Sequence, residues 1–292
     1  MNKRILSVYQ RAKRMEIDAH SKIVLFSDLH RGSGGGGDGF AKNEELFYAA
    51  LQHYLREGYT YIELGDGDEL WKEGDMAGIV GEYEHIFRLL VSFHTKGRFI
   101  MLSGNHDFMK RDKNWVREHL EEYKPRHGEQ VLPLFPEISV EEAILLHYLP
   151  ADQEILLLHG HQGDFFNSHL IRFGRLCVRY LWQPLEFLGL RNPFDAGQNH
   201  RRQSKVERNL KRFSQQNTLP IIAGHTHRPK FPKEGETSYF NTGSGIHTRY
   251  ITGFEITEGK IRQIRWELMV RVSGSLFVGR EVLSESRALG DL

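Results

Sequence analysis

Strand-like and helix-like segments alternate in the first third of the sequence, and this order constrains the fold more than any other feature. Three short apolar runs are typical of buried strands, and two stretches between them repeat apolar residues at helical spacing and end at a glycine. The strands are expected at Lys22–Asp28, Tyr59–Leu64 and Arg98–Leu102, and the helices at 43–57 and 80–96. A β-α-β-α-β order predicts a parallel sheet with right-handed crossovers.

The second half of the chain has a different pattern, in which strands follow one another through short connections. We expect them at Ala143–His147, Glu154–Leu158, Leu219–Ala223, Ser238–Asn241, Tyr250–Ile256 and Ile261–Val272. Apolar and polar residues alternate in the last of these, which predicts one solvated face. Residues 164–215 interrupt the pattern and predict a helical insert within a single domain, 1–292. The last dozen residues are expected to be poorly ordered.

Composition excludes several classes of protein. The chain has one cysteine, Cys177, so neither an internal disulfide framework nor a cysteine-rich zinc site can form. The formal net charge of +1 gives no overall attraction to nucleic acid or to membranes. The N-terminal segment lacks the apolar core of a secretory signal, and no stretch approaches the length of a transmembrane helix. We therefore expect a cytoplasmic protein.

Polar clusters rich in Asp, His and Asn follow five of the predicted strands. They are Asp28-Leu29-His30, Gly65-Asp66, Gly104-Asn105-His106-Asp107, His159-Gly160-His161 and Gly224-His225-Thr226-His227. Ligands bind beyond the carboxyl ends of strands in parallel α/β sheets, so these segments are expected to converge on one site. A single histidine at a strand end is more often a hydrogen-bonding cap, but capping does not explain the whole set.

The side chains in these clusters are those that bind divalent metal ions. Carboxylate, imidazole and amide oxygen together suit Mn, Fe or Zn, and a carboxylate between two cations can bridge them. In an extended segment such as Asp28–His30, residues two apart face the same way and can reach one metal or two neighbouring ones. Asp68 and Glu69 compete with Asp66 as metal ligands. Asp66 is favoured because it directly follows the predicted strand.

In this order, the motifs D-x-H, G-D, G-N-H-D, H-G-H and G-H-T-H resemble those of the calcineurin-like metallophosphoesterase family, from Lys22 to Thr257. The resemblance implies a four-layer α/β/β/α sandwich with a helical insertion. It also implies two divalent metal ions, with Mn favoured over Fe, Zn or Mg, and Asp66 as the bridge between them. The other implied ligands are Asp28, His30 and His227 for one metal, and Asn105, His159 and His225 for the other.

The same resemblance implies a hydrolase. Two cations about 3.5–4 Å apart lower the pKa of a bridging water, and the resulting hydroxide would attack phosphorus in a phosphate ester or pyrophosphate. His106 matches the position that protonates the leaving group or stabilises the phosphoryl oxygens, and Asp107 is expected to orient it by a hydrogen bond. A nuclease of the same superfamily and a non-catalytic metal-binding scaffold are the alternatives.

Parts of the chain resemble the UDP-2,3-diacylglucosamine pyrophosphatase branch of this superfamily more narrowly. They are residues 64–71, residues 159–164, and residues 224–229 followed by 241–244. That branch has a helical lid inserted where 164–215 lies here. It usually has arginine in place of His106, and His-Gly-Asp in place of His159-Gly160-His161. The implied substrate is a phosphorylated small molecule or a lipid-linked phosphate.

The predicted insert carries basic residues at helical spacing. Arg172, Arg175 and Arg179 fall on one stripe of a helix, and with His161 they are candidate contacts for a substrate phosphate. Amphipathic helices that simply pack on the sandwich are the alternative, and contact with a membrane surface is a third interpretation. A second basic helix over 201–212 indicates nucleic-acid contact only weakly, because aromatic residues are not interleaved with its charges.

The glycine-rich run Gly32–Gly39 offers a rival interpretation of the whole chain. Gly32, Gly34 and Gly37 have the spacing of a dinucleotide-binding fingerprint. However, the run begins four residues after Asp28 rather than in a tight strand-to-helix turn. An oxidoreductase would also leave the other polar clusters unexplained. A flexible loop at the mouth of the site is the favoured interpretation.

Overall fold

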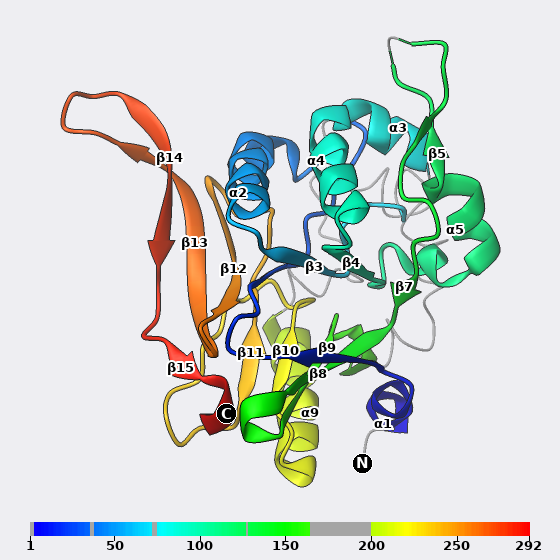
Figure 1. Ribbon diagram of the computed structural model, residues 1–292. Helices are drawn as coiled ribbons and strands as arrows, with labels where there is room; N and C mark the ends of the chain where they lie inside the picture. The colour runs from blue at the N-terminus through cyan, green and yellow to red at the C-terminus, as the bar shows by residue number, and fades with distance from the viewer. Residues whose placement is uncertain (1–2, 36–37, 72–74, 127, 164–199) are drawn as a thin grey trace.

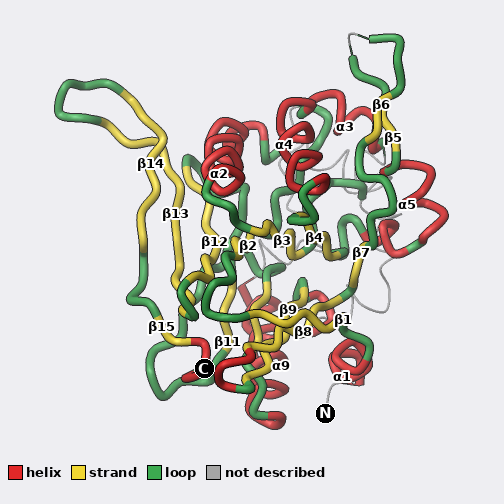
Figure 2. Tube along the Cα trace, viewed as in Figure 1, coloured by secondary structure: helices red, strands yellow, loops and turns green. Residues whose placement is uncertain are grey.

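A computed structural model describes residues 3–35, 38–71, 75–126, 128–163 and 200–292 of the chain, without the side chains of 200–202 (Figure 1). Two β-sheets lie face to face, and helices cover their outer faces (Figure 2). The helices are α1 (Lys3–Gln10), α2 (Glu44–Arg56), α3 (Met76–Glu82), α4 (Glu84–Thr95), α5 (Lys113–Leu120) and α9 (His200–Asn217). No described helix combines the length and the apolarity that a membrane crossing requires.

The larger sheet has eight strands and contains the predicted β-α-β-α-β unit. In spatial order its strands are β14 (Leu276–Val282), β13 (Lys260–Val270), β12 (Tyr250–Thr257), β2 (Ile23–Phe26), β3 (Thr60–Leu64), β4 (Phe99–Leu102) and β7 (Val140–Glu141), and β15 (Arg287–Ala288) also pairs with β13. The strands β2, β3, β4 and β7 run parallel, whereas β12, β13 and β14 are antiparallel to their neighbours. The carboxyl ends of β2, β3 and β4 therefore share one edge.

The smaller sheet has five strands. Their order is β1 (Lys13–Ile17), β8 (Ala143–Tyr148), β9 (Gln153–Leu158), β10 (Ile221–Ala223) and β11 (Tyr239–Asn241). The β8–β9 pair is antiparallel and the other pairs are parallel, so β9 and β10 end at the same edge. Neither β1 nor α1 was predicted from the sequence. A separate two-stranded ribbon consists of β5 (Glu122–Tyr123) and β6 (Leu132–Pro133).

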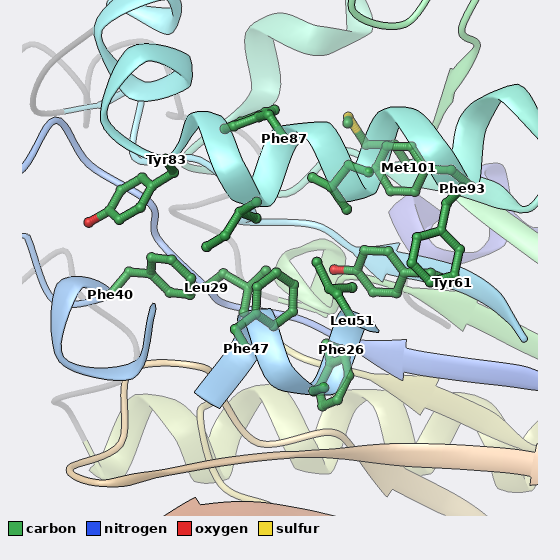
Figure 3. Close-up of a cluster of buried hydrophobic side chains, with 14 of the residues drawn as sticks. Phe26, Leu29, Phe40, Phe47, Leu51, Tyr61, Tyr83, Phe87, Phe93 and Met101 are labelled. Carbon is green, nitrogen blue, oxygen red and sulfur yellow. The ribbon is translucent and has the colours of Figure 1, made fainter. Parts of the chain in front are cut away.

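Three clusters of buried apolar side chains lie between the layers. The first joins the larger sheet to α2, α3 and α4 and is rich in aromatic rings, such as Phe26 and Phe47, whose centroids are 5.8 Å apart (Figure 3). The second fills the space between the sheets, and the third joins the smaller sheet to α1 and α9. This arrangement is the four-layer α/β/β/α sandwich that the family resemblance implied, and α9 is the described part of the predicted insert.

The helix expected over 80–96 is interrupted at Tyr83, where α3 ends and α4 begins. The hydroxyl of Tyr83 donates to the carboxylate of Asp38 at 2.5 Å. Asp38 also accepts the backbone N–H groups of Gly32, Gly34 and Phe40 at 3.0–3.1 Å. One carboxylate therefore anchors the described part of the glycine-rich segment.

The last dozen residues are attached to the rest of the fold by a short strand and one buried side chain. The strand β15 pairs with β13, and the side chain of Leu289 is fully buried in the cluster between the sheets. The expectation of a poorly ordered C-terminus is therefore wrong. It failed because a single buried leucine after a short strand leaves no periodic pattern in the sequence.

The strand expected at Ile261–Val272 is β13, but the apolar residues of its alternating pattern are buried only in the first half of the strand. Ile264 and Trp266 are buried against the helical layer, whereas Leu268 and Val270 on the same face are 46% and 65% exposed. The hairpin of β13 and β14 extends beyond α2, which leaves this part of the face uncovered (Figure 1).

Candidate metal centre

The loops that follow β2, β3, β4, β9 and β10 meet at one edge of the two sheets. Backbone hydrogen bonds tie neighbouring loops together: the N–H of Asp28 donates to the carbonyl of Gly65 (3.1 Å), and that of Gly224 donates to the carbonyl of His159 (2.9 Å). The polar clusters predicted from the sequence therefore converge, because strands that run the same way end at a shared edge.

Six of the predicted ligands form two triads of possible metal-binding atoms. The triads are Asp28 with His30 and His227, and Asp66 with His159 and His225. Within each triad all ligand atoms lie within 4.8 Å of one another. The two triads correspond to the two ligand sets that the family resemblance implied.

Asp66 belongs to the second triad and also faces the first. Its Oδ2 atom is 3.0 Å from Nε2 of His159 and 3.9 Å from Nε2 of His30. Its Oδ1 atom accepts the backbone N–H of His106 at 2.8 Å, which fixes the orientation of the carboxylate. One oxygen is thus held by the protein, and the other faces imidazoles of both triads, as a bridging carboxylate requires.

Asp28 is oriented in the same way. Its Oδ2 atom accepts the hydroxyl of Ser27 and the backbone N–H of His225, the latter at 2.8 Å. Its Oδ1 atom lies 3.1 Å from Nε2 of His227 and 3.9 Å from Nε2 of His159. Both buried carboxylates therefore direct one oxygen into the same group of histidines.

Five of the predicted ligands have a backbone conformation that residues other than glycine rarely adopt. The φ angles are +53° at Asp28, +51° at His30, +52° at Asp66, +68° at His225 and +54° at His227. Each residue held in this region costs about 1–3 kcal/mol, and such strain gathers at functional sites. The finding also corrects the expectation that Asp28–His30 is extended, because the loop turns sharply at each ligand.

Two glycines let the loops approach each other closely enough to place the carboxylates. A Cβ atom on Gly104 would lie 2.0 Å from Oδ1 of Asp66, and one on Gly224 would lie 2.5 Å from Oδ2 of Asp28. Both distances are far inside van der Waals contact, so any other residue would displace the carboxylates.

Buried polar atoms show that these residues suit a cation. Among the described residues, neither Oδ1 of Asn105 nor Nε2 of His159 has a hydrogen-bond partner. Nδ1 of His159 donates to the carbonyl of Leu64 at 2.8 Å, so Nε2 is the ring nitrogen that a cation can bind. Burying an acceptor without a donor is unfavourable, and a divalent cation bound by both atoms would remove that penalty.

The charges around the site attract positive charge to it. Burial alone would raise the pKa of Asp66, but the imidazoles of His159 and His106 hold it well below its usual value. Burial alone would lower the pKa of His159, but the carboxylates of Asp66 and Asp28 raise it to about 9. A metal ion at Nε2 of His159 would supply this positive charge in place of a proton.

His106 lies beside the triads and is held by neighbours on three sides. Its Nδ1 atom is 2.9 Å from the carboxylate of Glu69. The indole of Trp71 stacks on the imidazole with ring centroids 4.5 Å apart, and the ring of His30 meets it edge-on at 4.6 Å. Glu69 also contacts Nδ1 of His30 at 3.1 Å. One carboxylate therefore positions both a predicted ligand and the predicted acid.

The prediction that Asp107 orients His106 is wrong. The carboxylate of Asp107 instead accepts the backbone N–H groups of Gly104 at 2.6 Å and Gly67 at 3.2 Å. It therefore joins the loops after β3 and β4, which carry the predicted ligands of those strands, while Glu69 takes the position at the imidazole.

A fully buried network of charged side chains connects these loops. Arg31 donates to both oxygens of Glu63 (2.9 Å each) and to Asp68 (2.7 Å). Lys110 donates to Asp68 (2.5 Å) and Asp107 (3.0 Å). Burial alone would raise the pKa of Asp68, but these two cations lower it to about 2. The network connects the first three polar clusters through side chains that touch no solvent.

We expect Lys110→Met to destabilise the fold by about 3–5 kcal/mol, because it leaves two buried carboxylates short of a cation. The free energy of unfolding, measured by chemical denaturation, checks this. Lys113→Met is the matched control, since Lys113 is an exposed lysine in the next helix and should change stability little. Equal stabilities of the two variants would contradict the role of the network.

His161 lies outside both triads. Its Nε2 atom accepts from the guanidinium of Arg111 at 2.6 Å, and its ring lies 5.4 Å from that of His159. Burial, together with the charge of Arg111, keeps the pKa of His161 well below its usual value, so the ring is neutral. Its contact with a substrate stays a prediction. The other predicted substrate contacts, Arg172, Arg175 and Arg179, lie outside the described residues.

Sequence reasoning missed the roles of Glu69, Trp71, Arg31 and Lys110. It considered Glu69 only as a rival metal ligand. A usable signal was nevertheless present, because Arg31 directly follows the D-x-H motif and Lys110 lies three residues after the G-N-H-D motif. Basic side chains next to clustered acids indicate a buried ion-pair network as readily as a solvated surface.

Comparison with solved structures finds low similarity spread over most of the chain. Vacuolar Protein Sorting 29 from Cryptosporidium parvum is 14% identical, with a TM-score of 0.40, and the match covers 91% of this chain and 98% of that one. Vps29 from Chaetomium thermophilum is 10% identical, with a TM-score of 0.41 and the same coverage. A Staphylococcus aureus protein described as a 5′-nucleotidase, in complex with alpha-ketoglutarate, is 13% identical, with a TM-score of 0.37, over 90% of this chain and 53% of that one.

Similarity at this level says nothing about activity, and no curated protein matches the chain. The sequence model of the calcineurin-like phosphoesterase family, in contrast, matches residues 21–229. This range covers more than half of the chain, and both triads lie within it. The chain belongs to the calcineurin-like phosphoesterase family.

Proposed function

We propose that the chain is a metal-dependent phosphohydrolase that cleaves a phosphate ester or a pyrophosphate. One observation carries this proposal: Asp66 directs a single oxygen toward imidazoles of both triads, 3.0 Å and 3.9 Å away. A carboxylate in this position suits a pair of divalent cations, for which Mn²⁺ is our first candidate. The metals would supply positive charge for the phosphoryl oxygens and an acidic water as the nucleophile.

The protein's own groups hold this arrangement in place before a substrate arrives. Asp28 and Asp66 each use one oxygen to accept a backbone N–H, so neither carboxylate can rotate freely. The buried Arg31 and Lys110 fix the loops that carry them. Such preorganisation favours charge stabilisation in the transition state, because no further ordering is needed during the reaction.

His106 is our candidate for the group that donates a proton to the leaving oxygen. The Glu69 carboxylate contacts Nδ1 of the imidazole and places a negative charge beside the ring. The stacked Trp71 restricts rotation of the ring and also donates its indole N–H to the carbonyl of Asn105. A scaffold without catalysis would not require this arrangement, so we favour an enzyme over that alternative.

Narrow resemblance to the UDP-2,3-diacylglucosamine pyrophosphatase branch makes a nucleotide-linked or lipid-linked pyrophosphate our first choice of substrate. Rates should be compared for phosphomonoesters, phosphodiesters and nucleotide-sugar pyrophosphates, each with added Mn²⁺. A preference for the pyrophosphates would support that choice, and a preference for phosphodiesters would favour a nuclease.

Metal binding itself is expected to stabilise the protein. At a free Mn²⁺ concentration about 100 times the dissociation constant, each bound ion contributes about 2.7 kcal/mol. The melting temperature should then rise by roughly 5–10 °C relative to protein in chelator. Differential scanning fluorimetry measures this shift. Asp28→Asn should reduce it, whereas Asp152→Asn, which changes an exposed side chain, should not. No shift with any divalent ion would contradict the proposed centre.

A further inference from the structure

Exposed apolar side chains gather on one hairpin of the molecule. Among the described residues, most of the large apolar side chains that are exposed lie on β13, on β14 or in the segments that follow them. They are Leu268, Val270, Val272, Leu276, Val282 and Leu283. An apolar surface concentrated in one place usually marks an interaction site.

The outer strand of this hairpin, β14, is the edge of the larger sheet, and among the described strands it pairs only with β13. The N–H of Arg271 donates to the carbonyl of Ser275, and the N–H of Leu283 donates to the carbonyl of Gln263. The backbone N–H and C=O groups of odd-numbered residues in β14 therefore bond to β13. Antiparallel geometry then directs the N–H and C=O groups of even-numbered residues to the open edge. These residues are Leu276, Val278, Arg280 and Val282.

This edge lacks the features that usually prevent pairing with another chain, such as proline, lysine or a bulge. Its two charged side chains are already neutralised within the same sheet. Arg280 donates to Glu255 (2.6 Å from Nε), and Glu281 accepts from Arg265 at 2.6 Å. The open edge thus presents backbone hydrogen-bonding groups between exposed apolar side chains, without an unpaired charge.

We propose that β14 pairs antiparallel with β14 of a second copy, about a two-fold axis at Gly279. Even-numbered residues must then face even-numbered residues, so Leu276 lies opposite Val282 of the other copy, and Val278 lies opposite Arg280. In this register all of the outward backbone groups of β14 are used.

Neighbouring registers are less favourable. A centre at Arg280 would place two guanidinium groups opposite each other, and like charges directly opposed destabilise a sheet. A centre at Val278 would leave Val282 without a partner on the other strand. The register at Gly279 instead pairs Leu276 and Val282, which are 62% and 42% exposed in one chain. The resulting dimer is closed, because both copies use the same surface.

The oligomeric state in solution is the first test. Sedimentation velocity at micromolar concentrations should show a dimer for the unchanged chain. Leu276→Lys with Val282→Lys should raise the dimer dissociation constant by about 100-fold or more, because four buried ammonium groups would face the interface. Val131→Lys with Leu149→Lys is the matched control, since these side chains are 51% and 50% exposed elsewhere. A monomeric wild type, or equal effects of the two double variants, would overturn the proposal.

Disulfide cross-linking tests the register itself. In a background with Cys177→Ser, the double variant Leu276→Cys and Val282→Cys should form an intermolecular disulfide under mild oxidation. Opposed residues in a hydrogen-bonded pair have Cα atoms about 5.5 Å apart, within the range for a disulfide. Each single variant should stay uncross-linked, and so should Val278→Cys. Cross-linking by Val278→Cys alone, or none by the double variant, would rule out the register at Gly279.

Discussion

Asp66→Asn is expected to lose both metal binding and phosphohydrolase activity. The substitution keeps the shape of the side chain but removes the negative charge that faces both triads, and the amide can direct a nitrogen at the imidazoles instead of an oxygen. Turnover should fall by roughly 10³-fold or more, since the lost charge supports both cations. Calorimetric titration with Mn²⁺ and hydrolysis of a chromogenic phosphodiester measure the two losses separately.

Asp152→Asn is the control for this variant, because it makes the same chemical change on an exposed side chain. It should bind metal and turn over substrate as the unchanged protein does. If Asp66→Asn kept two metals and a normal rate, Asp66 would not be the bridge, and Asp28 would be the next candidate because its Oδ1 atom also faces histidines of both triads.

His106→Ala is expected to behave differently, because His106 lies beside the triads and belongs to neither. Metal binding should persist while turnover falls by about 10²–10⁴-fold, the usual range for a positioned acid. The loss should be largest for substrates with a poor leaving group, which need a proton most. For a nitrophenyl ester, whose leaving group is stable without a proton, the loss should be smaller.

Glu69→Gln provides a companion to that experiment. The amide can still contact Nδ1 of His106, but it no longer places a negative charge beside the ring, so we expect a smaller loss with the same dependence on leaving group. An undiminished rate for His106→Ala on a poor leaving group would remove His106 from the mechanism. If the rate fell in Glu69→Gln but not in His106→Ala, Glu69 would act through its contact with His30 instead.

The amino-acid sequence determined where the strands end and which polar residues follow them. Lys22–Asp28, Tyr59–Leu64 and Arg98–Leu102 were identifiable because a buried strand needs a short apolar run, which neighbouring residues alone provide. Parallel order then placed the clusters at one edge. For this reason the polar clusters could be placed together without a structure, and the family resemblance then implied which of their residues bind metal.

Tertiary structure decided how those residues are held. Whether Asp107 or Glu69 contacts His106 depends on the path of two loops that are 37 residues apart in the sequence, and no local pattern encodes it. The left-handed conformation of Asp66 is stable only because other segments hold its loop. Leu289, near the C-terminus, becomes part of the core only because β15 brings it between the sheets. The apolar periodicity of a strand or helix depends on residues that are adjacent in the sequence. Tertiary hydrogen-bond partners depend on segments that meet only after folding.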